Sequence, residues 1–141
     1  MTAVNVKGVN YTKYDAEQGN WVEQGKIFSD LKVWSDTYEA SAVDANSTIK
    51  MAHLPNGAVI HGMTLAFDDL GTGCTLSVGD STTANRYFNA VDVAAAAGVT
   101  SAIRVDGLGY VIGTNAGDND IIITTASAAI TGTIKLTVFY A

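Results

Sequence analysis

The stretch NGAVIHGMTLAFDDLGTGCTLSVG, residues 56–79, decides the fold class because apolar residues alternate through both of its halves. The alternating residues are Val59, His61, Met63, Leu65 and Phe67 in the first half, and Cys74, Leu76 and Val78 in the second. A period of two indicates strands with one buried face. Residues 68–73, DDLGTG, supply the Asp and Gly that turns use. The pattern therefore predicts a β-hairpin over residues 56–79.

Short strand candidates follow one another along the rest of the chain. Alternation and flanking turn residues predict strands at 26–40, 48–54, 86–91, 99–105, 110–113, 120–126 and 131–141, and a loop at 41–46. Asp92 followed by VAAAAG predicts one helical turn, with Asp92 as its N-cap and Gly98 as its stop. Eight or nine short strands predict an all-β protein, an antiparallel β-sandwich with a jelly-roll-like arrangement.

Residues 1–25 differ from the remainder because they hold no sustained period of two or of 3.6. They contain three aromatic residues, Tyr11, Tyr14 and Trp21. Aromatic residues are depleted in disordered segments and enriched at interfaces. We therefore expect an extended N-terminal arm over 1–25 and a β-sandwich domain over 26–141, with the three aromatics as partner-binding anchors of the arm.

The composition narrows the class of partner. Charged residues make up 16% of the chain, against about 25% in an average protein, which is common in proteins packed against other subunits. The net charge is −6 and the eight Lys and Arg are scattered, so the sequence predicts no direct nucleic-acid binding. It contains neither a spanning apolar run of about 20 residues nor a basic amphipathic helix. We therefore expect no membrane partner and, with no signal-peptide pattern, no secretion.

Nucleophilic catalysis needs Ser or Cys beside a His that a carboxylate orients. His61 alternates in phase with Met63, and His53 with Met51, which predicts that both point to the core or to a subunit contact. Cys74 is the single cysteine and alternates with apolar residues, so it is predicted to be a small buried side chain. No G-x-S-x-G motif occurs, and no catalytic triad is expected.

Two acidic clusters are the remaining candidates for chemistry. A glycosidase requires two carboxylates across the scissile bond, and the candidates are Asp68-Asp69 and the run Asp118-Asn119-Asp120. Acids in loops also suit Ca²⁺. Both clusters lie in turn-like segments, however, where Asp is expected to bond the backbone, and neither has the EF-hand spacing. The sequence predicts no catalytic residue, no metal site and no cofactor.

Two further groups of side chains are predicted to be structural. Asp80 and Arg86 flank one polar loop and would close it by an ion pair. Trp34, Tyr38 and Tyr87 offer an aromatic platform for sugars, although core or interface packing is the favoured interpretation. Apolar residues fall on both faces of residues 26–40, so this strand is expected to be covered on two sides near Trp34.

Three long runs carry a resemblance to a known group: LPNGAVIHGMTLAFDDLGTGCTLSVGDSTTANRYFNA, AAGVTSAIRVDGLGYVIG and DNDIIITTASAAITGTIKLTVFYA. Their marks are L-P-x-G-A-x-[IV] entering a strand, T-L-S-V-G-D before a polar loop and R-Y, and a closing T-G-T-I-K-L-x-V-x-Y. From about residue 6 to the end, the chain resembles virion structural proteins of tailed bacteriophages, in particular the head decoration or cement proteins. The resemblance transfers no functional residue, because the matching positions are structural.

The resemblance implies a homotrimer that is made in the host cytoplasm, sits on the outer capsid surface, clamps the major capsid protein and stabilises the head. It also implies that the chain is not an enzyme. One alternative is a tail, neck or fibre protein, including a receptor- or carbohydrate-binding module. Another is a small hydrolase that uses the loop carboxylates, for instance Asp69 or Asp118. The number of copies per particle separates a head coat from a tail component.

Overall fold

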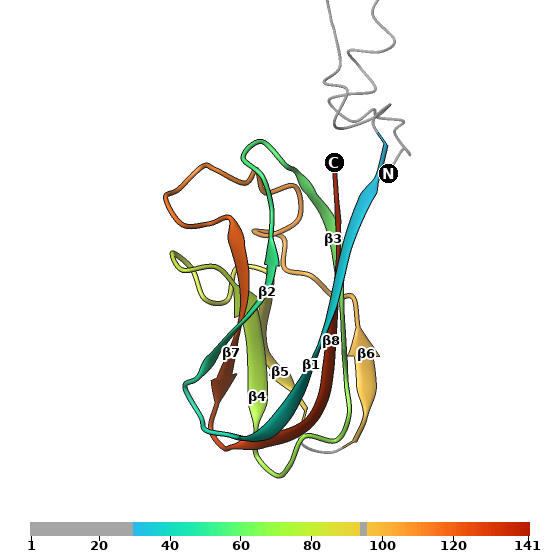
Figure 1. The fold of residues 1–141 in the computed structure, drawn as a ribbon, viewed down its shortest axis with the longest axis vertical. Helices are drawn as coiled ribbons and strands as arrows, with labels where there is room; N and C mark the ends of the chain where they lie inside the picture. Colours follow the sequence, from blue (N-terminus) through green and yellow to red (C-terminus); the bar gives the residue numbers. More distant parts are fainter. Residues whose placement is uncertain (1–29, 94–95) are drawn as a thin grey trace, which may run out of the picture. The chain divides into compact units, whose positions relative to one another are not determined.

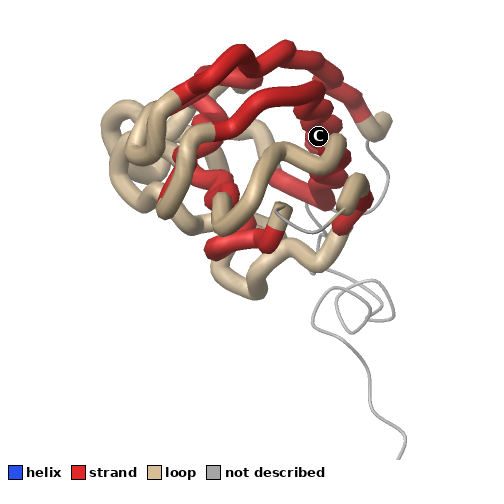
Figure 2. The backbone as a smooth tube through the Cα atoms, turned by 90° about the horizontal axis from the view of Figure 1, so that it is seen from below, coloured by secondary structure: helices blue, strands red, loops and turns tan. Residues whose placement is uncertain are grey.

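The computed structural model describes residues 30–93 and 96–141, and these residues form strands and loops (Figures 1 and 2). The strands are β1 Lys32–Val43, β2 Thr48–His53, β3 Ile60–Phe67, β4 Thr75–Gly79, β5 Phe88–Asp92, β6 Gly98–Thr100, β7 Asp120–Ala126 and β8 Ile130–Tyr140. Across the two described ranges, no helix has the length and apolarity needed to cross a membrane.

The strands form two four-stranded antiparallel sheets. Sheet A has the order β1-β8-β3-β6 and sheet B the order β2-β7-β4-β5 (Figure 1). The pairings nest, because β1 pairs with β8, β2 with β7, β3 with β6 and β4 with β5. Two packed antiparallel sheets confirm the predicted all-β sandwich.

The core lies between the sheets and is built mainly from one face of β2, β3, β4, β7 and β8. On β8 the buried residues are Ile134, Leu136 and Val138, at a spacing of two. Strand β7 contributes Ile121 and Ile123 in the same way. A further core residue, Cys74, is a buried thiol as predicted, and its Sγ donates to the Gly71 carbonyl at 3.2 Å. Burial raises the pKa of this thiol.

The predicted hairpin over residues 56–79 is wrong. Strand β3 belongs to sheet A and β4 to sheet B, so residues 68–74 cross from one sheet to the other. Alternation shows only that each strand has one buried face, and a crossing satisfies this condition as well as a hairpin does. The neighbouring pair β4 and β5 is joined within one sheet, through the polar loop that begins at Asp80.

The histidines do not point to the core, one of the two positions predicted for them, and two register shifts explain why; a subunit contact stays a prediction. One interrupts the pairing of β3 with β8 between Ile60 and Gly62, and another interrupts β2 with β7 between Lys50 and Ala52. A bulge inserts one residue and reverses the side-chain alternation beyond it. As a result His61 and His53 are exposed.

Three boundaries differ from expectation. Strand β1 continues to Val43, through part of the predicted loop at 41–46. Asp92 is the last residue of β5 and pairs with Thr75, and Gly98 is the first residue of β6. The cap and the stop of the predicted helical turn are therefore strand residues, because their backbones pair with neighbouring strands.

Two predicted strands near the loops are shorter than expected. Strand β6 ends at Thr100, and residues 110–113 contribute a single bridge between Val111 and Val59. The predicted arm at 1–25 and the first residues of the predicted strand at 26–40 lie outside the described residues.

Candidate interaction surface

Strand β1 is the edge strand of sheet A, and its residues 32–39 are all exposed. Trp34 and Tyr38 pair with Val138 and Ile134, whose side chains are buried in the core. Because paired residues share a face, Trp34 and Tyr38 lie on the inward face of sheet A. They are nevertheless 37% and 36% exposed. Sheet B therefore leaves this side of the sandwich open.

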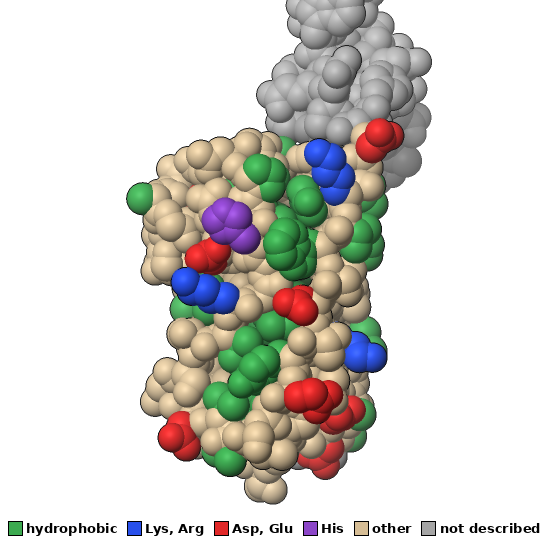
Figure 3. Space-filling model, viewed as in Figure 1, with side chains coloured by type: hydrophobic (Ala, Val, Ile, Leu, Met, Phe, Trp, Pro, Cys, Tyr) green, Lys and Arg blue, Asp and Glu red, His purple; other side chains and the backbone are tan. Residues whose placement is uncertain are grey.

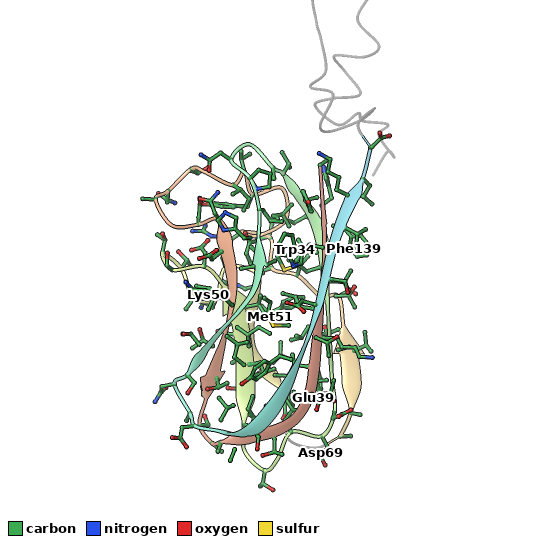
Figure 4. All side chains as sticks on the ribbon, viewed as in Figure 1. Trp34, Glu39, Lys50, Met51, Asp69 and Phe139 are labelled. Atoms are coloured by element: carbon green, nitrogen blue, oxygen red, sulfur yellow. The ribbon has the colours of Figure 1, made fainter. Side chains whose placement is uncertain are left out.

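Trp34 occupies the open side between β1 and β2. Its Nε1 donates a hydrogen bond to the Met51 carbonyl of β2 at 2.9 Å, so the indole joins the edges of the two sheets (Figure 4). Figure 3 shows hydrophobic side chains gathered along this line, with charged side chains on either side. We call Trp34, Asp36 and Tyr38 the open edge. It presents partly exposed aromatic surface.

The expected cover on both sides of this strand is not present among the described residues. Val33, on the opposite face of β1 from Trp34, is 56% exposed. The apolar residues on both faces of β1 predicted cover on two sides, and the described part of the chain does not supply it. A long edge strand with apolar side chains is a template for pairing with another chain.

The ion pair predicted between Asp80 and Arg86 is present and is buried. Arg86 Nε lies 2.7 Å from Asp80 Oδ2, with 12% and 0% of the two side chains exposed. The other carboxylate oxygen accepts backbone N–H bonds from Thr82 and Thr83 at 2.9 and 2.8 Å. A Cβ at Gly79 would overlap the Thr83 carbonyl, so the loop folds back on β4 because that position is glycine.

The same network continues to Asp118. The Arg86 guanidinium lies 3.9 Å from the centre of the Tyr110 ring, and the Tyr110 hydroxyl donates to Asp118 Oδ2 at 2.6 Å. Asp118 is fully buried and also accepts N–H bonds from Gly113 and Asn115 at 2.8 and 2.9 Å. Burial alone would raise the pKa of Asp118, but these three hydrogen bonds together lower it below its ordinary value.

The structure separates the three members of the run Asp118-Asn119-Asp120. Asn119 donates to the Leu54 carbonyl at 2.8 Å. Asp120 contacts His53 Nδ1 at 2.7 Å and Lys50 Nζ at 3.5 Å. The hydrogen bond with His53 is the main cause that lowers the pKa of Asp120. Asp118 and Asp120 therefore have separate partners, and the arrangement does not form a pair for general acid and base catalysis.

The other acidic pair, Asp68-Asp69, bonds the backbone of its own connector and of β8. Asp69 Oδ1 accepts from the Gly71 N–H at 3.3 Å, and Asp68 Oδ2 accepts from the Thr133 N–H at 3.1 Å. This agrees with the preference for a turn role. Over residues 30–93 and 96–141, no three His, Cys, Asp or Glu side chains gather as a metal site would require.

The three aromatics considered as a sugar platform are not brought together. Tyr87 is fully buried, and its ring packs edge-to-face on Tyr110 with 6.4 Å between centroids. Burial raises the pKa of the Tyr87 hydroxyl. Trp34 and Tyr38 share the open edge of β1 instead. Sequence reasoning identified these two residues but not their placement, because alternation does not reveal which strand lies at the edge of a sheet. Tyr11, Tyr14 and Trp21 lie outside the described residues.

Comparison with known proteins identifies phage capsids as structural neighbours. No protein-family model and no curated protein matches the sequence. A chain of the cyanophage Pam1 capsid asymmetric unit superposes with a TM-score of 0.68 and 25% identity, covering 99% of this chain and 98% of that one. A chain of the Ralstonia phage GP4 capsid gives 0.61 and 26%, covering 79% and 84%. These matches confirm the resemblance to phage virion structural proteins.

Proposed function

We propose that the chain decorates a phage head, where it binds the lattice of the major capsid protein on the outer surface and stabilises it without catalysis. The similarity to two phage capsid chains supports a structural role in the virion. The nested strand pairing supports a jelly-roll topology, which capsid-associated proteins use widely. The protein is made in the host cytoplasm and joins the particle there.

The observation that carries the proposal is the open edge of β1. Trp34 and Tyr38 face inward by register and yet remain 37% and 36% exposed. Buried aromatic anchors dominate the energetics of protein interfaces. The free edge of β1 also offers main-chain groups to which a partner can add an extended strand. A shell subunit that covers this edge would complete the sandwich.

Attachment needs only modest affinity at each contact. Copies that self-associate, as a homotrimer in this proposal, present several open edges to the lattice at once. Linked contacts multiply modest affinities, because the second and third binding events become intramolecular. The charge-poor surface, with 16% charged residues in the chain, suits close packing among neighbouring subunits.

The N-terminal segment supplies a second proposed contact. Tyr11, Tyr14 and Trp21 lie outside the described residues, and we propose that they anchor the segment to a neighbouring subunit. Deleting residues 1–20 is expected to leave the sandwich folded and to abolish particle binding. Unimpaired binding by the truncated protein would remove the segment from the proposal.

The test of the open edge uses particles that lack this protein and purified full-length chain. Trp34→Ala is expected to weaken binding at least tenfold in co-sedimentation, since truncating a central aromatic anchor removes about 2 kcal/mol or more. Val105→Ala is the matched control, because Val105 is 86% exposed in a loop outside the open edge. Equal binding by the two variants would contradict the proposal.

A second candidate function has one observation in its favour. Trp34 and Tyr38 flank Asp36 on an exposed edge, and exposed aromatics beside a carboxylate are also used to bind sugars. Specific hits on a glycan array, lost in Trp34→Ala, would favour a receptor-binding module of a tail or fibre. The copy number decides between the two, because hundreds of copies per particle indicate a head coat and a handful indicates a tail component.

A further inference from the structure

The turn between β2 and β3 carries the only Asn-Gly pair in the sequence, Asn56 and Gly57. The Ala58 N–H donates to the Pro55 carbonyl at 3.2 Å, and Gly57 has a φ of +89°. Asn56 does not share this positive φ, so the turn is of type II, with Asn56 at its second position and Gly57 at its third. Both residues are exposed to solvent. The function proposed above makes no use of them.

An asparagine that precedes glycine can lose its side-chain amide through a ring that the backbone closes. The Gly57 nitrogen attacks Asn56 Cγ, the new N–Cγ bond replaces the Cγ–Nδ2 bond, and the Gly57 N–H proton leaves with Nδ2 as ammonia. Water then opens the ring. Breaking the N–Cγ bond gives aspartate, and breaking the original peptide C–N bond gives isoaspartate, whose main chain runs through Cγ. Glycine favours the reaction because it has no Cβ to crowd the ring.

The fold keeps the attacking nitrogen away from this reaction. The Gly57 N–H donates to the Ile112 carbonyl at 2.8 Å, and the Ile112 N–H donates to the Ala58 carbonyl at 2.8 Å. In a type II turn the second residue has a ψ of about +120°, and at that angle the Gly57 nitrogen is turned away from the Asn56 side chain. The peptide between the two residues therefore has to rotate before the ring can close, and this rotation breaks the hydrogen bond with Ile112.

The side chain that would be attacked is held as well. Asn119 Nδ2 donates to Asn56 Oδ1 and to the Leu54 carbonyl, both at 2.8 Å. The Leu54 N–H donates in return to the Asn119 carbonyl at 2.9 Å. The Asn56 side chain also lies against Gly113, where a Cβ would be 3.0 Å from Oδ1. Residues 112–119 therefore fix both reacting groups of the Asn-Gly pair.

We propose that Asn56 is a deamidation site whose rate is set by the contact between this turn and residues 112–119. The exposed Asn-Gly pair has the chemistry for ring closure. The hydrogen bonds to Ile112 and Asn119 keep the reacting atoms apart in the folded chain. A local opening of the contact releases both groups together. The reaction consumes water and needs no enzyme, so its product accumulates with the age of the molecule.

The isoaspartate product does not fit the turn, because its main chain is longer by one carbon atom. The hydrogen bonds of Gly57 and Ala58 have the spacing of the ordinary chain. The next residue, Val59, donates to the Ala141 carbonyl at 2.9 Å and accepts from the Ala141 N–H at 3.1 Å. A longer turn displaces these bonds at the point where β3 begins. The modification is therefore expected to lower the stability of the sandwich.

The experiment incubates the purified full-length chain in mildly alkaline buffer at a fixed temperature. Peptide mass spectrometry follows the loss of the Asn56 amide with time, and labelling by an isoaspartate methyltransferase distinguishes isoaspartate from aspartate. The reaction in the native chain is expected to be about tenfold slower, or more, than in the same chain unfolded by guanidinium chloride, since the native reaction waits for local opening.

Three variants locate the control of the rate. Asn119→Ala removes the donor to Asn56 Oδ1 and is expected to speed the reaction about three- to tenfold, as the loss of one hydrogen bond implies. Asn115→Ala is the matched control, because Asn115 lies in the same loop and its side chain donates to the Tyr110 hydroxyl at 3.2 Å rather than to the turn. Asn56→Ala has no side-chain amide, so its melting temperature should stay constant during incubation while that of the wild type falls.

Three results would overturn the inference. These are no product at Asn56 in either the native or the unfolded chain, equal rates in the two, and a folded Asn119→Ala variant that reacts no faster than Asn115→Ala. Thermal melting before incubation shows that each variant is folded. Particle binding by freshly prepared chain tests decoration separately, so a failure of decoration leaves this inference intact.

Discussion

The hydrogen-bond network around Asp80, Arg86 and Asp118 and the strand β1 differ in which side chains they bury. In the network, Asp80, Arg86 and Asp118 are ionisable residues that the fold largely buries and holds with hydrogen bonds. On β1, the aromatic Trp34 and the aliphatic Val33 remain exposed. The ionisable residues, which resemble an active site in their chemistry, hold loops in place. The apolar residues, which would be typical of a core, are exposed on β1.

This contrast matters for assigning function to a protein with such a composition. Buried polar groups that bond to one another stabilise one conformation. Exposed apolar groups on a rigid strand have a free energy of burial still to gain. The difference predicts that substitutions in the network change folding, whereas substitutions on β1 change association.

The largest expected effect is at Asp80. Asp80→Ala leaves the Arg86 guanidinium buried without its ion pair and should lower the free energy of unfolding by about 3–5 kcal/mol. Urea denaturation of the variant and the wild type measures this difference in the free energy of unfolding. Asp106→Ala is the matched control, because Asp106 Oδ2 lies 3.5 Å from Arg104 Nη2 in a pair whose side chains are 66% and 38% exposed, respectively. The loss of stability in this variant should be at most about 1 kcal/mol. Similar losses in both variants would erase the contrast between buried and exposed charges.

A smaller and pH-dependent effect is expected at Asp118. Its pKa is lowered in the folded state, so its contribution to stability is present above the unfolded pKa of about 4 and disappears as the pH falls through the folded value. Asp118→Asn should therefore be less stable at pH 7 by about 1–3 kcal/mol. The deficit should shrink below about pH 4, where the wild-type carboxyl also becomes protonated. Melting curves at pH 7 and pH 3 that show the same deficit would contradict this assignment.

The smallest expected effect on folding is on β1. Tyr38→Ala should change the free energy of unfolding by no more than about 0.5–1 kcal/mol, since Tyr38 is more than one-third exposed and lies at a sheet edge. The same variant should bind particles more weakly than the wild type. A large loss of stability with normal binding would show that Tyr38 belongs to the core, and would remove it from the proposed contact.

Much of the sandwich was predictable because alternation is a local property. Ile134, Leu136 and Val138 of β8 lie at the spacing that the sequence shows, and all three are buried as the alternation predicts. The ion pair of Asp80 with Arg86 was predictable for the same reason, because six residues and one loop separate the partners. Such features depend on side chains that are close together in the chain.

The remaining features depend on partners far away in the sequence. The exposure of His53 and His61 follows from register shifts against β7 and β8, and alternation within one strand carries no signal of a bulge in its pairing. The open edge required knowledge that β1 is the last strand of its sheet. The tyrosine that holds Asp118 is eight positions away in an irregular loop, where no periodicity indicates a contact.

The pairing of β1 with β8 also has a consequence for biosynthesis. Strand β8 lies between β1 and β3 and ends one residue before the end of the described chain. A nascent polypeptide therefore cannot assemble sheet A until β8, which follows the other described strands in the chain, has left the ribosome. Until then β1 has no strand to pair with and β3 lacks one of its two partners. Both strands remain accessible to chaperones and to other unfinished chains. Folding that depends on such distant segments is slow compared with folding through local contacts, so the emergence of β8 is the event that allows each molecule to complete its sandwich.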